Sequence, residues 1–390
     1  MKKKVLIHTL FYENYNYGGI LQAYALYHKL SEMGYSCEEL NYNRIITGKV
    51  KKILCRGWRI LEIAREPIYN IKMRKQRKIQ EQQRQLYISK MKCDLLKEVF
   101  SCFMEKEFIS TKVYTGATIK ELSVYDYYIV GGDQVWNPQW TDINFFFGNV
   151  YGRKKIGYSC SAGKDHFTKH EKKKILKLIK NMDVVSVREH NFSELLSEEG
   201  INNQVIADPV YLMTRDEWSE FSNDCYQLPE KYIFAYLLGE DEERRKIIKN
   251  FAKQNNMKIV SIPHVFRRYN IADEDFADVE INDAGPKEFV SLIKNADFVV
   301  TDSFHGTAFS LIFEKQFLNF SRFRSNDKRS LNVRLINILK EYGIEDRHIE
   351  LFELEKVETN KLKEIDYIQL INITQRKRKE AIDFLRESLL

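Results

Sequence analysis

The sequence lacks the long apolar runs that a membrane-spanning helix requires. No stretch of its 390 residues approaches about 18 consecutive apolar positions. The basic N-terminal residues are followed by a short apolar run that contains His8, and no small-residue cleavage site comes after it. We therefore interpret 4–10 as a first buried strand rather than a signal peptide, and we expect a cytoplasmic protein.

Paired cysteines and the common cofactor signatures are also missing. The six cysteines stand singly along the chain, with no CxxC pair and no Cys/His cluster at the spacing of a zinc site. Walker, GxGxxG and HExxH motifs are absent. We therefore predict buried or idle thiols in a reducing compartment, no metal site and no cofactor.

Positive charge is abundant, but it is concentrated in one segment. The net charge is +7, and 44–112 alone holds 18 Lys and Arg against 7 Asp and Glu, so this segment carries +11 and the rest −4. That distribution argues against a nucleic-acid-binding protein. The segment looks helical, and two interpretations stay open. It is either a solvated helical excursion, or a membrane-peripheral surface that faces anionic lipid or a lipid-diphosphate-linked acceptor.

Outside this segment, short apolar runs alternate with amphipathic ones, which is typical of βαβ units and a mainly parallel sheet. This pattern predicts an N-terminal α/β domain at 1–215 with the basic helical insertion at 44–112, a C-terminal α/β domain at 230–345, and a C-terminal helix at 361–390 that packs back on both. Two Rossmann-like domains leave a cleft at the C-terminal ends of their strands, where ligands bind in such sheets.

Two turns of the N-terminal domain are expected to reach the cleft. The first holds Asn16 and the pair Gly18 and Gly19, which would let the backbone approach a ligand at a helix N-terminus.

The second of these turns holds Asp133, Gln134 and Trp136. A carboxylate that accepts hydroxyl hydrogens and an indole that stacks on a sugar face suit a sugar site. For both turns the alternative is ordinary turn geometry, with Asp133 capping a helix.

A third turn places Arg188 just past an expected strand at 184–187. Its planar guanidinium suits a phosphate or a carboxylate, because it can bind two oxygens at once. The alternative is a surface charge pair between Arg188 and Glu189.

The fourth turn, 301–306, follows an expected strand and begins a helix. His305 would lie near the positive end of that helix, where it can hold an anion or move a proton near neutral pH. Ser303 adds a hydroxyl, and Thr307 adds a first-turn contact. The alternative is a capped helix start with a buried, satisfied histidine, but we expect this turn to lie at the active site.

Together these motifs resemble the polysaccharide pyruvyl transferase family. The resemblance rests on NYGGILQAYAL at 16–26, VGGD at 130–133, SVRE at 186–189, ADPV at 207–210 and TDSFHGT at 301–307. It implies a GT-B-like fold, that of two-domain glycosyltransferases. It also implies transfer of the enolpyruvyl carbons of phosphoenolpyruvate to a sugar hydroxyl, forming a pyruvate ketal on a cell-surface polysaccharide or its lipid-linked precursor.

The resemblance also suggests roles for residues. Arg188 and His305 match a family arginine and a family histidine that are expected at the donor. We assign catalysis to His305 and Asp133, donor binding to Arg188, Ser303, Gly306 and Thr307, and the acceptor side of the cleft to Asn16, Gly18, Gly19, Gln134 and Trp136.

One departure from the family's pattern matters for the donor. Many members carry Arg-Leu-His-Gly where this chain has Ser303-Phe304-His305-Gly306. Loss of that arginine removes a phosphate contact usually worth more than about 1.5 kcal/mol. A basic residue of the following segment could replace it, namely Arg322, Arg324, Lys328, Arg329 or Arg334. Two alternatives stay open, a nucleotide-sugar glycosyltransferase on the same scaffold and a non-catalytic carbohydrate-binding protein.

Overall fold

The structure is a computed structural model that describes residues 2–44, 93–122, 125–138, 143–148, 152–164, 166–263, 270–322, 333–349 and 363–390. Most of the basic segment 44–112, with its expected helices and lipid contact, therefore lies outside the described residues. The part that is described contains helix α4 (Cys93–Glu107). No helix in the described ranges combines the length and the apolar composition needed to cross a membrane.

The first half of the chain builds a six-stranded parallel sheet in the order β2-β1-β5-β6-β7-β8. The strands are β1 (Lys4–His8), β2 (Ser36–Glu39), β5 (Tyr125–Gly131), β6 (Gly152–Cys160), β7 (Val184–Val187) and β8 (Gln204–Val205). Its helices are α1 (Tyr17–Glu32), α5 (Lys169–Ile179) and α6 (His190–Glu198). The apolar runs of β1 and β5 are buried almost throughout, as expected for a parallel sheet covered on both faces.

The second half builds another six-stranded parallel sheet, in the order β11-β10-β9-β12-β13-β14. These strands are β9 (Tyr232–Tyr236), β10 (Lys258–Ser261), β11 (Val279–Glu280), β12 (Phe298–Thr301), β13 (Gln316–Phe320) and β14 (His348–Ile349). Its helices are α8 (Glu242–Gln254), α9 (Pro286–Lys294), α10 (Phe304–Ile312) and α11 (Val333–Tyr342). Strand order reverses between β9 and β12 here, and between β1 and β5 in the first sheet. Such switch points are where sheets of this kind bind ligands.

The two halves share an apolar interface. One buried core cluster includes residues of α1, α9 and α10. The ring of Tyr17, at the start of α1, stacks on Phe289 of α9 with centroids 4.6 Å apart, and its hydroxyl donates to the carbonyl of Ala284 at 2.7 Å. This packing brings the N-terminus of α1 against the start of α10.

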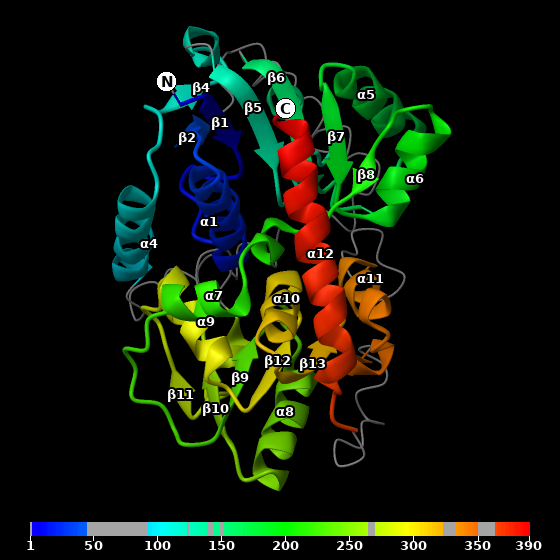
Figure 1. Cartoon of the computed structure of the whole chain (residues 1–390). Coiled ribbons are helices and arrows are strands. Elements are labelled where there is room, and N and C mark those ends of the chain that lie inside the picture. Colours follow the sequence, from blue (N-terminus) through cyan, green and yellow to red (C-terminus); the bar gives the residue numbers. More distant parts are fainter. Residues whose placement is uncertain are drawn as a thin grey trace, which may run out of the picture.

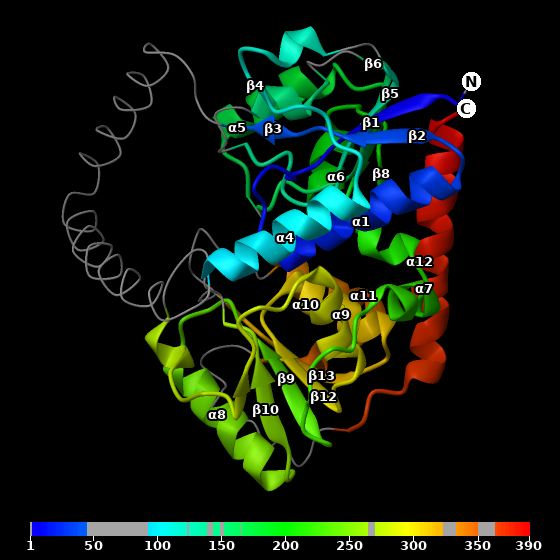
Figure 2. The same ribbon diagram turned by 90° about the vertical axis from the view of Figure 1, so that its left-hand side faces the viewer.

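Helix α12 (Tyr367–Ser388) lies along both halves (Figures 1 and 2). Leu370, near its start, belongs to the core cluster shared with α9 and α10, whereas Phe384 and Leu385 pack on the first sheet. The helix begins later than the predicted 361, because Asp366 caps it by accepting the backbone N–H of Ile368 at 3.0 Å.

Candidate active site

A cavity of about 440 Å³ lies where the two switch points face each other. Its size suits a small ligand. The first half lines it with the residues after β1 and β5, and the second half with the turn after β12 and with two arginines. Its polar and aromatic lining includes Thr9, Tyr12, Glu13, Asn14, Asn16, Tyr42, Arg44, Asp133, Gln134, Ser303, Phe304, His305, Arg322 and Arg334.

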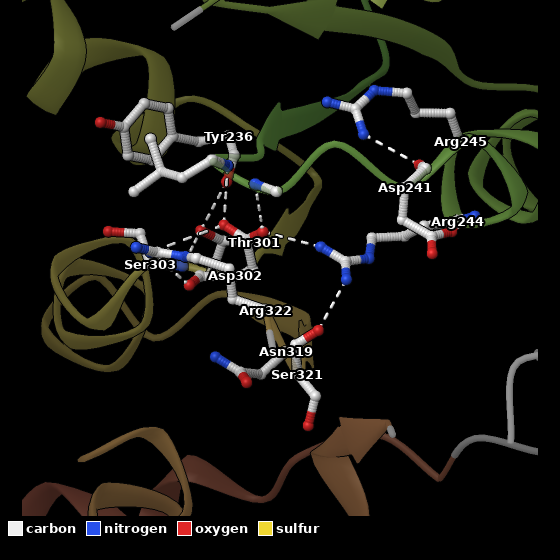
Figure 3. A network of polar contacts seen from close by, with 12 residues as sticks. Tyr236, Asp241, Arg244, Arg245, Thr301, Asp302, Ser303, Asn319, Ser321 and Arg322 are labelled. Atoms are coloured by element: carbon white, nitrogen blue, oxygen red, sulfur yellow. Dashed lines mark hydrogen bonds and ion pairs between the residues drawn. The ribbon is translucent and has the colours of Figure 1, made fainter. Parts of the chain in front are cut away.

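Asp302, the first residue after β12, ties the second sheet together (Figure 3). Its fully buried carboxylate accepts the backbone N–H groups of Leu238 and Gly239 at 2.7 and 2.8 Å and pairs with Arg244 at 2.7 Å. Burial alone would raise the pKa of Asp302, but Arg322 and Arg244 hold it below its ordinary value. Asp302 therefore fixes the ends of β9 and β12 and is not a ligand contact.

Ser303 lines the cavity and caps α10. Its Oγ accepts the backbone N–H of Gly306 at 3.4 Å. This is the capped helix start that the sequence analysis gives as the alternative for this turn.

Gly306 and Thr307 lie inside the packing of α10, not on the cavity, which corrects their expected contact with the donor. A Cβ on Gly306 would come 2.4 Å from Oγ1 of Thr301. The hydroxyl of Thr307 donates to the carbonyl of Ser303 and accepts from Asn319.

His305 lies between α1 and a buried carboxylate. Its side chain lines the cavity, and Nε2 is 3.5 Å from Oδ2 of Asp208. Burial alone would raise the pKa of Asp208, but His305 and Arg188 hold it at about 2. Asp208 is therefore ionised at neutral pH and places a negative charge beside the imidazole ring.

Gly18 makes room for the same ring. A Cβ built on Gly18 would come within 1.9 Å of Nδ1 of His305. The glycine therefore admits the histidine of the other half of the chain, which corrects the expectation that it admits a ligand. Gly19 likewise packs against the Asn14 amide, 2.6 Å from a Cβ placed there.

We expect Gly18→Ala to lower the free energy of unfolding by about 1–3 kcal/mol, because the added methyl overlaps a confined ring. Gly-to-Ala in an ordinary helix would instead raise it by about 1 kcal/mol. Urea unfolding measures the difference. Gly19→Ala is the matched comparison and should cost less, because a Cβ there would come only within 2.6 Å of the end of the Asn14 side chain. A stabilised Gly18→Ala would contradict the contact.

Arg188 is buried rather than paired on the surface. Its Nη1 is 2.6 Å from Asp208, its Nε is 3.3 Å from Glu189, and its guanidinium stacks on Phe304 at 4.6 Å. Burial would lower the pKa of Arg188, but Glu189, Asp208 and Asp133 outweigh this and raise it. Among the described residues Nη2 has no hydrogen-bond partner and is 3.9 Å from Asp133.

Arg188 and Asp208 line a second cavity, of about 340 Å³, between β7, β8, α11 and α12. Phe304 and Arg334 line both cavities, so the two pockets meet at these side chains. The sequence predicts that Arg188 and His305 contact the same donor. In the structure Arg188 lines the second cavity and His305 lines the first.

Two arginines of the following segment line the cavity that Ser303 lines. Arg322 lines the first cavity and donates through Nη2 to the carbonyl of Asp302 at 2.8 Å. Arg334 lies 3.8 Å from Asp133, and burial together with repulsion from Arg188 lowers its pKa to about 10, so it stays charged at neutral pH. The other three basic residues considered as replacements, Arg324, Lys328 and Arg329, lie outside the described residues.

The remaining predicted residues divide between the cavity and the core. Asn16 and Gln134 line the cavity, and Asn16 also caps α1 by accepting the N–H of Gly19 at 3.0 Å. Trp136 does not face the cleft, which corrects its assignment. It is fully buried, stacks on Phe147 and donates to the carbonyl of Phe146.

Sequence reasoning gave no role to Asp208, Phe304 or Thr9. Asp208 belongs to the ADPV motif and Phe304 to the predicted turn. Both residues were therefore part of recognised motifs, but neither was given a role. Thr9 follows the first strand at a switch point, and that position was the only signal for it.

Comparison with known proteins relates this chain to a family and to a fold. A family model described as polysaccharide pyruvyl transferase matches residues 16–325. UDP-GlcNAc 2-epimerase from Neisseria meningitidis, solved with UDP-GlcNAc, aligns with a TM-score of 0.50 and 11% identity over 100% of this chain and 99% of that one. This likeness shows the fold, the two Rossmann-like domains of the GT-B type that the sequence predicts.

Two further solved structures align with lower TM-scores. UDP-GlcNAc 2-epimerase from Methanocaldococcus jannaschii has a TM-score of 0.47 at 13% identity, covering 94% of each chain. The E. coli heptosyltransferase WaaC with ADP-2-deoxy-2-fluoro heptose has a TM-score of 0.37 at 12% identity, covering 87% of this chain and 99% of that one. None of the curated proteins matches the sequence.

Proposed function

Because the chain belongs to the polysaccharide pyruvyl transferase family, we propose that it transfers the pyruvyl carbons of phosphoenolpyruvate to a sugar. The acceptor would be a hydroxyl-bearing residue of a cell-surface polysaccharide or of its lipid-linked precursor. The observation that carries this proposal is that the guanidinium groups of Arg322 and Arg334 and the imidazole of His305 line one small cavity at the switch points.

Phosphoenolpyruvate is a small, highly charged ligand with a phosphate and a carboxylate. Guanidinium groups bind both through paired hydrogen bonds. Arg322 and Arg334 stand in for the arginine that many family members carry at the position of Ser303. Arg188 lines the second cavity. Its Nη2, which has no hydrogen-bond partner among the described residues, lies 3.9 Å from Asp133 of the first cavity. Arg188 therefore adds positive charge next to the donor site.

The chemistry needs a proton for the enol carbon and a path for phosphate to leave. We assign the proton to His305, whose Nε2 lies 3.5 Å from the carboxylate of Asp208. Protonation of C3 makes C2 electrophilic, a sugar hydroxyl adds there, phosphate leaves, and a second hydroxyl closes the ketal. The sequence assigned Asp133 to catalysis, but its carboxylate lies 3.9 Å from Arg188 and 3.8 Å from Arg334, so we assign it instead to holding these guanidinium groups.

Calorimetry with phosphoenolpyruvate tests the donor assignment. Arg334→Met and Arg322→Met should each weaken the Kd by about 10- to 150-fold, because a hydrogen bond to a charged group contributes about 1.5–3 kcal/mol. Arg153→Met is the control, since that side chain is 77% exposed and lies far from the cavity on β6.

Two outcomes would overturn the donor assignment. One is that the unaltered protein fails to bind phosphoenolpyruvate and to release phosphate when a glycan is added. The other is that it binds a nucleotide sugar in preference. The epimerase from Neisseria meningitidis shares this fold and was solved with UDP-GlcNAc, so UDP-GlcNAc is the competing ligand to titrate.

A further inference from the structure

Glu39, the last residue of β2, buries a carboxyl group beside the active-site cavity. The residue is 0% exposed. Its Oε1 accepts the backbone N–H of Thr9 at 3.0 Å and the hydroxyl of Thr9 at 2.6 Å. Its Oε2 has no hydrogen-bond partner among the described residues. The backbones of Ile109 and Thr111 bond to the backbone of Glu39 and cover it from outside.

This carboxyl group differs from the other buried acids of the protein in having no cation beside it. Asp208 and Asp302 each pair with an arginine, whereas no ion pair to Glu39 occurs in the part of the chain that is described. The ionisable groups that face Glu39 are the phenols of Tyr27 and Tyr128 and the thiol of Cys37, which are neutral near pH 7.

Burial without a cation has a consequence for protonation. It raises the pKa of Glu39 to about 8, although the hydrogen bonds from Thr9 oppose the shift. A purely structural acceptor for Thr9 would be served as well by glutamine, without the cost of a buried acid. A carboxyl group that changes charge near neutral pH at the edge of a cleft is instead typical of proton transfer.

Thr9 connects this carboxyl group to the cavity. It directly follows β1, at the switch point of the first sheet, and it lines the cavity opposite the turn that holds Ser303 and His305. Because its hydroxyl hydrogen is donated to Glu39, the lone pairs of its oxygen remain to accept a hydrogen from a ligand.

We propose that Thr9 and Glu39 form a proton relay that deprotonates the acceptor hydroxyl. The inference rests on the proposed function. As the sugar oxygen bonds to C2 of the donor, its O–H bond breaks and the proton passes to Oγ1 of Thr9. The hydroxyl proton of Thr9 passes to Oε1 of Glu39, which ends as a neutral acid. His305 supplies the separate proton that C3 of the donor gains.

The other acids near the cavity are less suited to this step, because Glu13 is exposed to solvent and two others are held by cations. Asp133 lies within 3.9 Å of two guanidinium groups, and Asp208 is held by Arg188 and His305. Both serve cations that the donor needs. Among the described residues the Glu39 carboxyl group bonds only to the backbone N–H and the hydroxyl of Thr9, so gaining a proton breaks no ion pair there.

Glu39→Gln and Thr9→Val test the relay with phosphate release as the readout. Each should lower kcat by about 100- to 10,000-fold while KM for phosphoenolpyruvate stays unchanged. Thr9→Ser keeps the hydroxyl and should keep most of the activity. Glu38→Gln is the matched control, because Glu38 lies on the same strand but bonds to Tyr125.

Two further readouts separate the relay from a structural role. The ratio of wild-type kcat to Glu39→Gln kcat should rise with pH and level off above about pH 8, where Glu39 is ionised. His305 is present in both proteins, so its contribution cancels in this ratio. The melting temperature of Glu39→Gln at pH 8 should match or exceed that of the wild type, because a buried charge has been removed.

The outcomes distinguish the two proposals. A Glu39→Gln protein with unchanged kcat and an unchanged pH profile would overturn the relay and leave the proposed function standing. A wild-type protein that releases no phosphate from phosphoenolpyruvate with any glycan would overturn the proposed function and the relay with it.

Discussion

Replacing His305 with Gln is expected to lower kcat for phosphate release by about 100- to 10,000-fold. Glutamine can still bond to Asp208, but it cannot deliver a proton to the enol carbon near neutral pH. The loss should appear in kcat, with a smaller change in the affinity for phosphoenolpyruvate, because Arg322 and Arg334 remain. Steady-state kinetics and calorimetry on the same preparation measure the two quantities.

His190→Gln is the control for this substitution. His190 begins α6, is 59% exposed on its side chain, and faces Glu341 at 3.4 Å on the rim of the second cavity. Its replacement should leave kcat unchanged. Near-wild-type turnover in His305→Gln would remove the histidine from the chemistry, and a collapse of its thermal transition would assign it a structural role instead.

Arg244→Leu is expected to cost about 3–5 kcal/mol of unfolding free energy, because it removes the closest cation from the buried Asp302 carboxylate. Arg244 and Asp302 are both 0% exposed, and Arg244 also donates to the carbonyl of Ser321 at 2.6 Å (Figure 3). Urea unfolding at pH 7 measures this cost.

Two comparisons sharpen the Arg244 experiment. Adding Asp302→Asn to Arg244→Leu should recover part of the loss, since no charge remains buried. Lys246→Met, which breaks an exposed ion pair on the same helix, should cost no more than about 1 kcal/mol. A loss in Arg244→Leu as small as this would contradict the tie between β9 and β12.

The stabilisation by Asp302 also has a defined pH range. Its pKa is lowered in the folded protein. Its contribution is therefore fully present above the ordinary Asp pKa of about 3.9 and is lost as the pH falls through the lower, folded value. The cost of Arg244→Leu should accordingly shrink in acid.

The sheets and the place of the cleft could be predicted from the sequence because they depend on local patterns. The apolar runs that form β1 and β5 are strands in the structure, and the turn at 301–306 follows β12 at a switch point. The start of a helix could be predicted only where its cap residue was recognised. Asp366, which caps α12, was not recognised, so the helix predicted at 361–390 began too early.

The partners of the site residues could not be predicted, because they are distant in sequence. Gly18 contacts His305, and Asp208 joins Arg188 to His305. No local spacing encodes such pairs. Trp136 shows the same limit, because a turn with glycines and an indole fits a sugar site and a core equally well. Only the packing of Phe147 against the indole decides between them.

The central claim is tested most directly by incubating the protein with phosphoenolpyruvate labelled in its carbon atoms and with a candidate glycan. The account predicts that labelled pyruvyl carbons appear on the glycan in equal amount to the phosphate released, and that His305→Gln abolishes both together. Phosphate released without label on any glycan, or label transferred equally well by His305→Gln, would contradict it.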